Sequence, residues 1–141
     1  NQTVPEDMDG DSMLKLVREP KSSEWREYLD LEHALCYHWQ NNWVALTDGK
    51  WKYVFFRSTG DEQLFNLESD PNEERELSSE NEYQEELEKW RERMVQHLSE
   101  RGKKWVKDGE LQTQKRKVLY SPHYPEYKPS WFERIRKKFH K

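Results

Sequence analysis

The side chains best suited to binding a small ligand lie within one short segment. Glu32, His33, His38 and Trp39 supply a carboxylate, two imidazoles and an indole. A hydrogen-bonding imidazole beside a flat ring, as in His38-Trp39, is a common arrangement for holding a sugar. Side chains alternate across a strand, so Glu32 and His33 cannot both face the same ligand. A histidine on a sheet is more often a hydrogen-bonded structural residue, and both interpretations of His33 stay open.

The sequence supplies no nucleophile and no metal centre that we can assign. Cys36 is the single cysteine, which excludes an internal disulfide and a multi-cysteine metal site. A lone cysteine in a strand-like run is usually a small buried hydrophobic residue. Asp7, Asp9 and Asp11 surround Gly10 but lack the downstream glutamate and the spacing of an EF-hand loop. We therefore predict no catalytic residue and no metal ligand in this chain.

The composition predicts a small aromatic core and two regions of opposite charge. Only 33% of the 141 residues are apolar, but seven are tryptophan and seven are tyrosine, and large rings bury much area in few positions. Residues 101–141 carry 13 Lys and Arg against 4 Asp and Glu, which leaves 11 against 24 in residues 1–100. This asymmetry favours a basic tail that folds back onto the acidic body or onto an acidic partner. No apolar run is long enough for a transmembrane helix.

Residues 43–67 predict three antiparallel strands joined by two tight turns. Asp48-Gly49 lies between two runs rich in aromatic and β-branched residues, which predicts a type I′ turn with positive φ at both positions. Gly60 supplies the positive φ for the second turn. Residues 25–37 alternate as a half-buried strand does and complete a four-stranded sheet. Alternation places three aromatic rings on one face of the middle strand: Trp51, Tyr53 and Phe55.

Two short helices are predicted from their starting residues. Asp11 or Ser12 caps a helix that continues to Arg18 and stops before Pro20. Residues 70–73, with the sequence Asp-Pro-Asn-Glu, have the pattern of a second helix start, for a helix of one or two turns.

One long helix is predicted over residues 80–101. A capping box at residues 79–82 starts it, and Gly102 is suited to its C-terminal end. We expect its apolar stripe to pack on the aromatic face of the sheet, which predicts an α+β fold. The stripe repeats every three or four residues: Tyr83, Leu87, Trp90, Met94 and Leu98.

Four elements follow one another in an order that is familiar from one family. Residues 48–53 match a "DGK-KY" hairpin, and residues 60–77 match the pattern "G-E-LF-L--DP-E--NL". Residues 9–14 are similar to a "DG-SL-PL" segment, and Glu32-His33 is similar to a "GEH" element, with Leu31 in place of glycine. Over about residues 5–102 the chain thus resembles the C-terminal subdomain of the type I, formylglycine-dependent sulfatases, which include the arylsulfatases.

The resemblance implies a small four-stranded antiparallel sheet packed by one long C-terminal helix. We expect residues 1–21 to be a linker and short helix from the end of a catalytic domain. Residues 22–102 would form the subdomain itself, with its helix over 80–101. Residues 103–141 match nothing that we can place and would form an irregular, basic, aromatic extension.

The resemblance also implies that the reaction centre lies in an N-terminal catalytic domain, which this subdomain would buttress. Formylglycine, made from a Cys or Ser in a C-x-P-S-R-type motif, and calcium are expected in that domain. Cys36 is followed by Tyr-His-Trp-Gln and does not match the motif. The chain also opens at Asn1 without an initiator methionine, so we expect it to be part of a longer protein.

The expected substrate of the full enzyme is a sulfated sugar or an aryl sulfate. Glu32, His33, His38 and Trp39 are the residues expected to reach its pocket. The family implies an exported protein, either periplasmic, secreted or lysosomal, without a nucleic-acid partner or a transmembrane segment. The alternative is a stand-alone binding module, whose basic aromatic tail binds an anionic glycan, a membrane or a nucleic acid.

Overall fold

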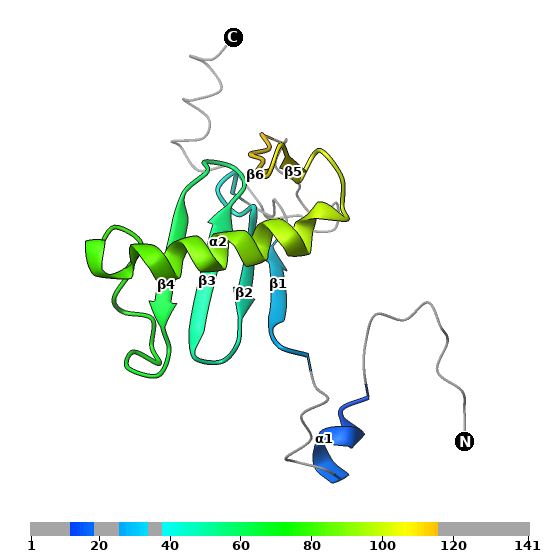
Figure 1. Cartoon of the computed structure of the whole chain (residues 1–141), viewed down its shortest axis with the longest axis vertical. Coiled ribbons are helices and arrows are strands. Elements are labelled where there is room, and N and C mark those ends of the chain that lie inside the picture. The colour runs from blue at the N-terminus through cyan, green and yellow to red at the C-terminus, as the bar shows by residue number, and fades with distance from the viewer. Residues whose placement is uncertain (1–11, 19–25, 34–37, 116–141) are drawn as a thin grey trace, which may run out of the picture.

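The computed structural model describes residues 12–18, 26–33 and 38–115. A four-stranded antiparallel sheet, in the order β1-β2-β3-β4, is crossed on one face by the helix α2 (Figure 1). The predicted α+β fold, with one long helix on a four-stranded sheet, is therefore confirmed. The elements are α1 (Leu14–Arg18), β1 (Leu29–His33), β2 (Trp43–Thr47), β3 (Trp51–Phe56), β4 (Glu62–Asn66), a 3-10 turn (Asn81–Tyr83), α2 (Gln84–Ser99), β5 (Val106–Lys107) and β6 (Glu110–Leu111).

The main core lies between α2 and the sheet. The predicted stripe of α2 is buried at Leu87, Trp90, Met94 and Leu98, while Tyr83 packs at its margin. Trp90 is fully buried, and its indole N–H donates to the carboxylate of Glu86 at 2.9 Å. The aromatic face predicted for β3 is also confirmed, because three strand side chains meet the stripe: Trp51, Tyr53 and Phe55.

The opposite face of the sheet has a smaller apolar cluster. Ala45, Val54 and Phe65 are buried there, and Trp43 and Phe56 are half-buried beside them. The outermost strand leaves two leucines largely exposed, Leu29 at 48% and Leu31 at 43%.

An ionic seam joins β1 to α2. Arg93, His97 and Arg101 are spaced four residues apart along the helix, so they share one face. His97 and Arg101 lie 3.5 and 3.6 Å from the carboxylate of Asp30, and Arg101 also pairs with Glu32. Arg93 lies 3.8 Å from the carboxylate of Glu27, just before β1. The carboxylates of β1 that point toward α2 therefore lie against polar and charged side chains of the helix and the turn that follows it, rather than apolar ones.

The β2–β3 turn differs from the type I′ turn that was predicted. Positive φ occurs at Gly49, with a value of 88°, but not at Asp48. The Asp48 carboxylate accepts the backbone N–H groups of Lys50 and Trp51 at 2.9 and 2.8 Å. Aspartate stabilises the turn as an acceptor here, so its backbone has no need of the left-handed region.

The helix predicted from Asp70 onward is not formed. The chain makes a turn there, Glu73 has a positive φ of 57°, and the Asp70 carboxylate accepts the N–H of Arg75 at 2.8 Å. The segment then runs back along β4, where Leu77 donates to the carbonyl of Leu64 at 2.9 Å. Asp70 caps a turn with the same chemistry that caps a helix, which explains the misleading pattern.

The boundaries of the long helix and the first strand also differ from the prediction. The capping box is wrong, because the 3-10 turn and α2 both start without a side-chain cap hydrogen bond. The helix ends at Ser99, and Gly102, with φ 87°, ends the turn that follows it. Strand β1 begins at Leu29 rather than Trp25, and residues 34–37 lie outside the described part of the chain.

A hairpin that was not predicted follows α2. Strands β5 and β6 pair through Asp108 and Gly109, whose φ values of 53° and 80° are both positive. Of the two Asp-Gly pairs in the described residues, this is the one with positive φ at both positions, as a type I′ turn requires. Trp105, Val106 and Leu111 pack against the main core.

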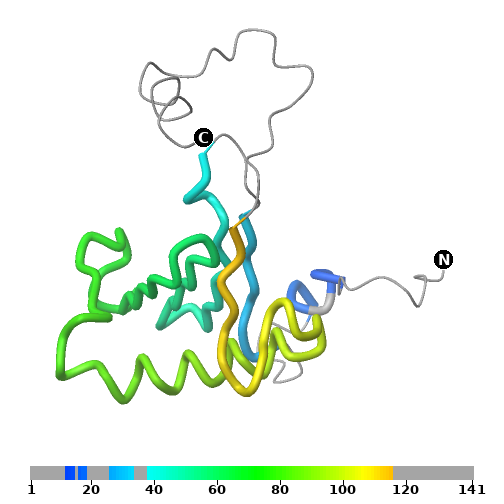
Figure 2. The backbone as a smooth tube through the Cα atoms, turned by 90° about the horizontal axis from the view of Figure 1, so that it is seen from above, coloured from blue at the N-terminus to red at the C-terminus, as the bar shows by residue number. Residues whose placement is uncertain are grey.

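The segment after β6 returns to the sheet. Gln114 donates its N–H to the carbonyl of Arg57 at 2.5 Å, and its own carbonyl accepts from the Asn42 side chain at 3.3 Å. Figure 2 shows this segment, in orange, running past the start of β2. The boundary predicted at residue 102 stays a prediction, but residues 105–114 contact the body of the fold.

Helix α1 forms where it was predicted, over Leu14–Arg18. Its apolar residues Leu14 and Val17, and Met13 just before it, are 60–75% exposed. Among the described residues, no helix is long and apolar enough to cross a membrane, and no group of three metal-ligating side chains occurs. The Asp7-Asp9-Asp11 cluster and the basic aromatic tail from residue 116 lie outside the described residues.

Candidate functional site

A hollow of about 460 Å³ lies where three connections meet at one end of the sheet. The β1–β2 connection, the β3–β4 turn and the segment that runs back along β4 form its walls around residues of β2, β3 and β4. Its described lining consists of Gln40, Asn41, Trp43, Phe56, Thr59, Asp61, Glu62, Gln63 and Glu76.

Backbone hydrogen bonds set the shape of the β3–β4 turn. The backbone N–H of Phe56 donates to the carbonyl of Asp61 at 2.9 Å, and the N–H of Gly60 donates to the carbonyl of Phe56 at 2.7 Å. The φ of Gly60 is 91°, as predicted for this turn. Arg57 donates its N–H to the carbonyl of Asn42 at 2.8 Å, so the turn is fixed directly to the β1–β2 connection.

A row of three rings crosses the face of the sheet opposite α2. The register pairs His33 with Trp43, and Trp43 with Phe56. The His33 and Trp43 rings are stacked, with centroids 5.6 Å apart and planes 25° apart. Nδ1 of His33 lies 3.2 Å from the carbonyl oxygen of Asn41, so His33 contacts both the aromatic row and the hollow's wall.

Glu62 connects the hollow to the core on the other side of the sheet. Its carboxylate accepts from the Tyr53 hydroxyl at 2.5 Å and from two nitrogens of Arg91 at 2.7 Å. Burial alone raises the pKa of Glu62, but the hydrogen bonds from Arg91 and Tyr53 outweigh burial and hold the pKa below its usual value. Burial first, and then the Glu62 carboxylate, raise the pKa of Tyr53. Glu62 is therefore ionised and Tyr53 neutral near pH 7.

The other two carboxylates of the lining differ in their partners. Glu76 accepts the backbone N–H groups of Leu64 at 3.0 Å and Ser78 at 2.6 Å. Asp61 is exposed at the rim. None of the nine lining residues is lysine or arginine, so the described walls present carboxylates, amides and rings to a ligand, with no cationic side chain.

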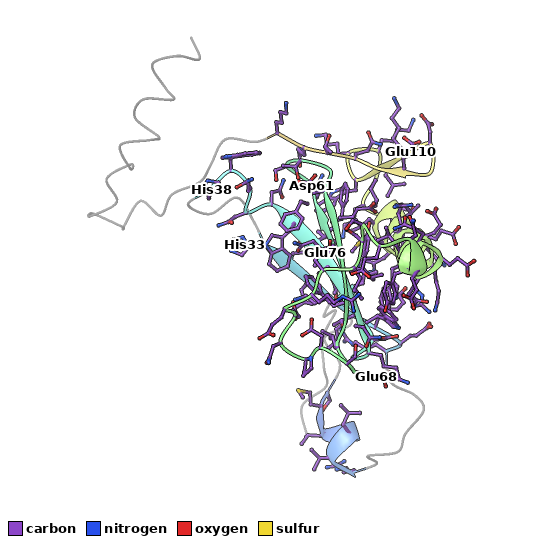
Figure 3. The ribbon with its side chains drawn as sticks, turned by 90° about the vertical axis from the view of Figure 1, so that its left-hand side faces the viewer. His33, His38, Asp61, Glu68, Glu76 and Glu110 are labelled. Carbon is purple, nitrogen blue, oxygen red and sulfur yellow. The ribbon has the colours of Figure 1, made fainter. Side chains whose placement is uncertain are left out.

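The four predicted ligand-binding residues are divided between two faces. Figure 3 shows His33 and His38 on the side of the sheet away from α2, toward the end where Asp61 lies. His38 is exposed, and its Nδ1 accepts the N–H of Gln40 at 3.2 Å. Trp39 is half-buried, with its ring 6.0 Å from that of His38. Glu32 points to the α2 side and pairs with Arg101.

The hollow itself was not predicted from the sequence. His33, His38 and Trp39 border or adjoin it but do not line it. Asp61 and Gln63 follow Gly60, just before and within β4. The turn pattern therefore predicted their position but not their proximity to Gln40 and Glu76. The position of Glu76 depends on the path of residues 70–79, which was predicted to contain a helix, whereas Gln40 is brought close by the Arg57–Asn42 hydrogen bond.

Comparison with known proteins places this fold in one family. A family model described as N-sulphoglucosamine sulphohydrolase, C-terminal, matches residues 1–101. An arylsulfatase from Clostridium perfringens (strain 13 / Type A) is 32% identical over 99 residues, which are 70% of this chain and 20% of that protein. The chain thus spans about a fifth of the length of this relative.

Solved sulfatase structures share the fold at low sequence identity. A putative sulfatase from Bacteroides thetaiotaomicron has a TM-score of 0.60 and 18% identity, over 89% of this chain and 27% of that chain. BT4656, solved with its substrate D-glucosamine-2-N,6-O-disulfate, has a TM-score of 0.56 and 18% identity. The match covers 70% of this chain and 20% of that chain. The chain belongs to the N-sulphoglucosamine sulphohydrolase C-terminal family and is a C-terminal subdomain of a sulfatase.

Proposed function

We propose that this chain serves as the C-terminal part of a sulfuric ester hydrolase whose reaction is carried out by an N-terminal catalytic domain. The observation that carries the proposal is the family match over residues 1–101, together with a relative of which this chain covers 20%. Formylglycine and calcium would supply the nucleophile and the charge stabilisation in the catalytic domain. The subdomain would buttress that domain and contribute residues to the substrate pocket.

The face opposite α2 is the one that we assign to the substrate. His33 and His38 lie on that side, near the hollow, and His33 stacks on Trp43, which lines it. Glu32 is the weakest of the four predicted ligand-binding residues, because its carboxylate pairs with Arg101 on the α2 side. In the full enzyme we expect a sulfated sugar or aryl sulfate as the substrate and an exported location.

A chimeric enzyme tests this role. The segment of the Clostridium perfringens arylsulfatase that matches this chain would be replaced by residues 1–115, and the hydrolysis of para-nitrocatechol sulfate would be measured. We expect an active chimera, no turnover by the 141-residue chain alone, and no activity in a chimera whose formylglycine precursor is replaced by alanine. Turnover by the isolated chain would contradict the division of labour that we propose.

His33→Ala in the same chimera tests the assignment of the face. A rise in KM with unchanged kcat would show that the histidine supports ground-state binding. Gln96→Ala, an exposed position on α2, is the matched control. Equal kcat/KM values for the His33 variant and the control would remove His33 from the substrate-binding residues.

A further inference from the structure

We propose that the hollow binds an unsulfated sugar unit through its ring face and hydroxyl groups, and that it disfavours a sulfate group. This assigns to the subdomain a ligand chemistry opposite to that of a sulfate-binding centre. The claim that the sugar belongs to a sulfatase substrate depends on the function proposed above, whereas the binding itself does not.

Aromatic rings supply the apolar surface that a sugar ring requires. Trp43 and Phe56 are adjacent in the register of β2 and β3, and both are half-buried and line the hollow. His33 covers one face of the Trp43 ring, which limits the orientations open to the indole. Small-ligand sites typically combine such rings with a few fixed polar groups.

Amide and carboxylate groups surround these rings. The side-chain amides of Gln40 and Gln63 make no hydrogen bond to the described part of the chain, although both residues line the hollow. Each amide has both donors and an acceptor, and the exposed Asp61 carboxylate adds acceptors. A hydroxyl group can donate and accept, so adjacent sugar hydroxyls match this mixture better than an acceptor-only sulfate does.

The charge of the lining opposes an anion. Among the lining residues that the structure describes, Asp61, Glu62 and Glu76 contribute three carboxylates and none contributes a cation. Glu62 is compensated by Arg91, but Arg91 donates to Glu62 and Glu88 and does not line the hollow. A sulfate placed against Asp61 and Glu76 would meet like charge at short range, where the interaction is poorly screened.

The volume is sufficient for a monosaccharide unit. A cavity of about 460 Å³ lies within the range of small-molecule sites, roughly 300–1,000 Å³. The hollow would therefore read the part of a glycan that carries no sulfate. If the chain has the function proposed above, the hollow would favour substrates in which the sugar unit next to the sulfated one carries no sulfate where it meets the hollow.

Two sugars that differ in one sulfate test the inference directly. The ¹⁵N-labelled 141-residue chain would be titrated with N-acetyl-D-glucosamine and with N-acetyl-D-glucosamine 6-sulfate, and followed by NMR. We expect the unsulfated sugar to shift the indole N–H of Trp43 and the side-chain amides of Gln40 and Gln63. Its affinity should exceed that of the sulfated sugar by about fivefold, as like-charge repulsion predicts. Equal or tighter binding of the sulfated sugar would overturn the proposal, as would unchanged Trp43 and Gln63 signals.

Two variants separate the contribution of hydrogen bonding from that of charge. Gln63→Ala should weaken binding of the unsulfated sugar by about threefold or more, as loss of one hydrogen bond predicts, while Gln96→Ala on exposed α2 should leave it unchanged. Asp61→Asn should reduce the affinity ratio between the unsulfated and the sulfated sugar. Unperturbed signals elsewhere in the spectrum establish that each variant is folded. A Gln63→Ala chain that binds as tightly as the control would exclude this hollow.

The two proposals fail in different ways. An active chimera without sugar binding by the chain would refute the hollow and leave the sulfatase role intact. Sugar binding without an active chimera would support the hollow as a glycan site and contradict the sulfatase role. Binding of an oligolysine peptide in place of the sugar, with the same Trp43 shift, would overturn the sugar assignment in favour of a basic partner.

Discussion

The two faces of the sheet differ in what covers them and in what their polar groups do. On the α2 side, Leu46, Tyr53 and Leu64 are completely buried beneath Trp90. On the opposite side, Trp43 and Phe56 stay half-buried around a hollow. Both faces come from the same strands by simple alternation, so the difference arises from the cover and not from the strands.

The comparison indicates a separation of tasks. Buried apolar contact stabilises the α2 face, where each large side chain removed leaves a cavity. The other face combines rings with amides and carboxylates that lack a packed partner layer in the described structure, as ligand sites do. Stability and ligand binding should therefore respond to substitutions on opposite faces.

The largest expected effect is on the free energy of unfolding, when one tryptophan on each face is replaced by alanine. Trp90→Ala should reduce the free energy of unfolding by about 3–5 kcal/mol, because it empties a fully buried site. Trp43→Ala should cost about half as much or less, because the ring is only half-buried. Urea unfolding followed by circular dichroism measures both. Equal losses would show that the two faces contribute alike to the core.

Acid should weaken the contact that Glu62 makes between the hollow and the core on the α2 side. Its lowered pKa means that its stabilising effect is present above the unfolded value, about 4.3, and is lost as pH falls through the folded value. Glu62→Gln should cost about 1–2 kcal/mol at pH 7, since charge-assisted hydrogen bonds to Arg91 are lost. The difference from wild type should shrink below pH 4.

Urea titrations at pH 7, 5 and 3.5 test the sign of this effect. Glu92→Gln removes a carboxylate from an exposed position on α2 and serves as the control. A cost of Glu62→Gln that grows as the pH falls would be inconsistent with a lowered pKa.

The sequence predicted the α2 face well because that face depends on periodicity. The stripe containing Leu87, Trp90 and Met94 and the alternation of Tyr53 with Val54 are local patterns, and each has one way to bury its apolar side. Packing of the stripe on the aromatic strand face was then expected, because that face offered a matching apolar surface.

The hollow could not be predicted in the same way. Its walls come from residues 40–41, 59–63 and 76. Strand pairing and the Arg57–Asn42 hydrogen bond bring the first two segments together, and Glu76 joins them because residues 70–79 turn back along β4. The Asp70 carboxylate can accept backbone hydrogen bonds in a turn as readily as at a helix start, so the sequence pattern did not distinguish the two structures. Likewise, Asp48-Gly49 and Asp108-Gly109 are the same dipeptide, but positive φ at both residues occurs only in the second.

The rim of the hollow offers a smaller test, since backbone geometry rather than packing shapes it. Gly60→Ala places a Cβ 3.2 Å from the Thr113 methyl group and adds strain at φ 91°. Gly49→Ala has nearly the same φ, 88°, and nothing within 4 Å, so it measures the strain alone. We expect about 1 kcal/mol for Gly49→Ala and more for Gly60→Ala. Identical costs in thermal unfolding would mean that residues 112–114 do not press on the turn.

The smallest expected effect concerns the ionic seam, in which carboxylates of β1 pair with basic side chains of α2 and the turn that follows it. Arg101 pairs with Asp30 and Glu32, and these side chains are 32–44% exposed. Partly exposed pairs contribute little, so Arg101→Gln should cost about 0.5 kcal/mol or less at low salt and less still in 1 M NaCl. Lys103→Gln makes the same charge change at an exposed position nearby. A salt-independent loss of more than about 1 kcal/mol for Arg101→Gln would instead assign the arginine's contribution to packing, most directly on Trp105, whose ring centroid lies 4.9 Å from its guanidinium carbon.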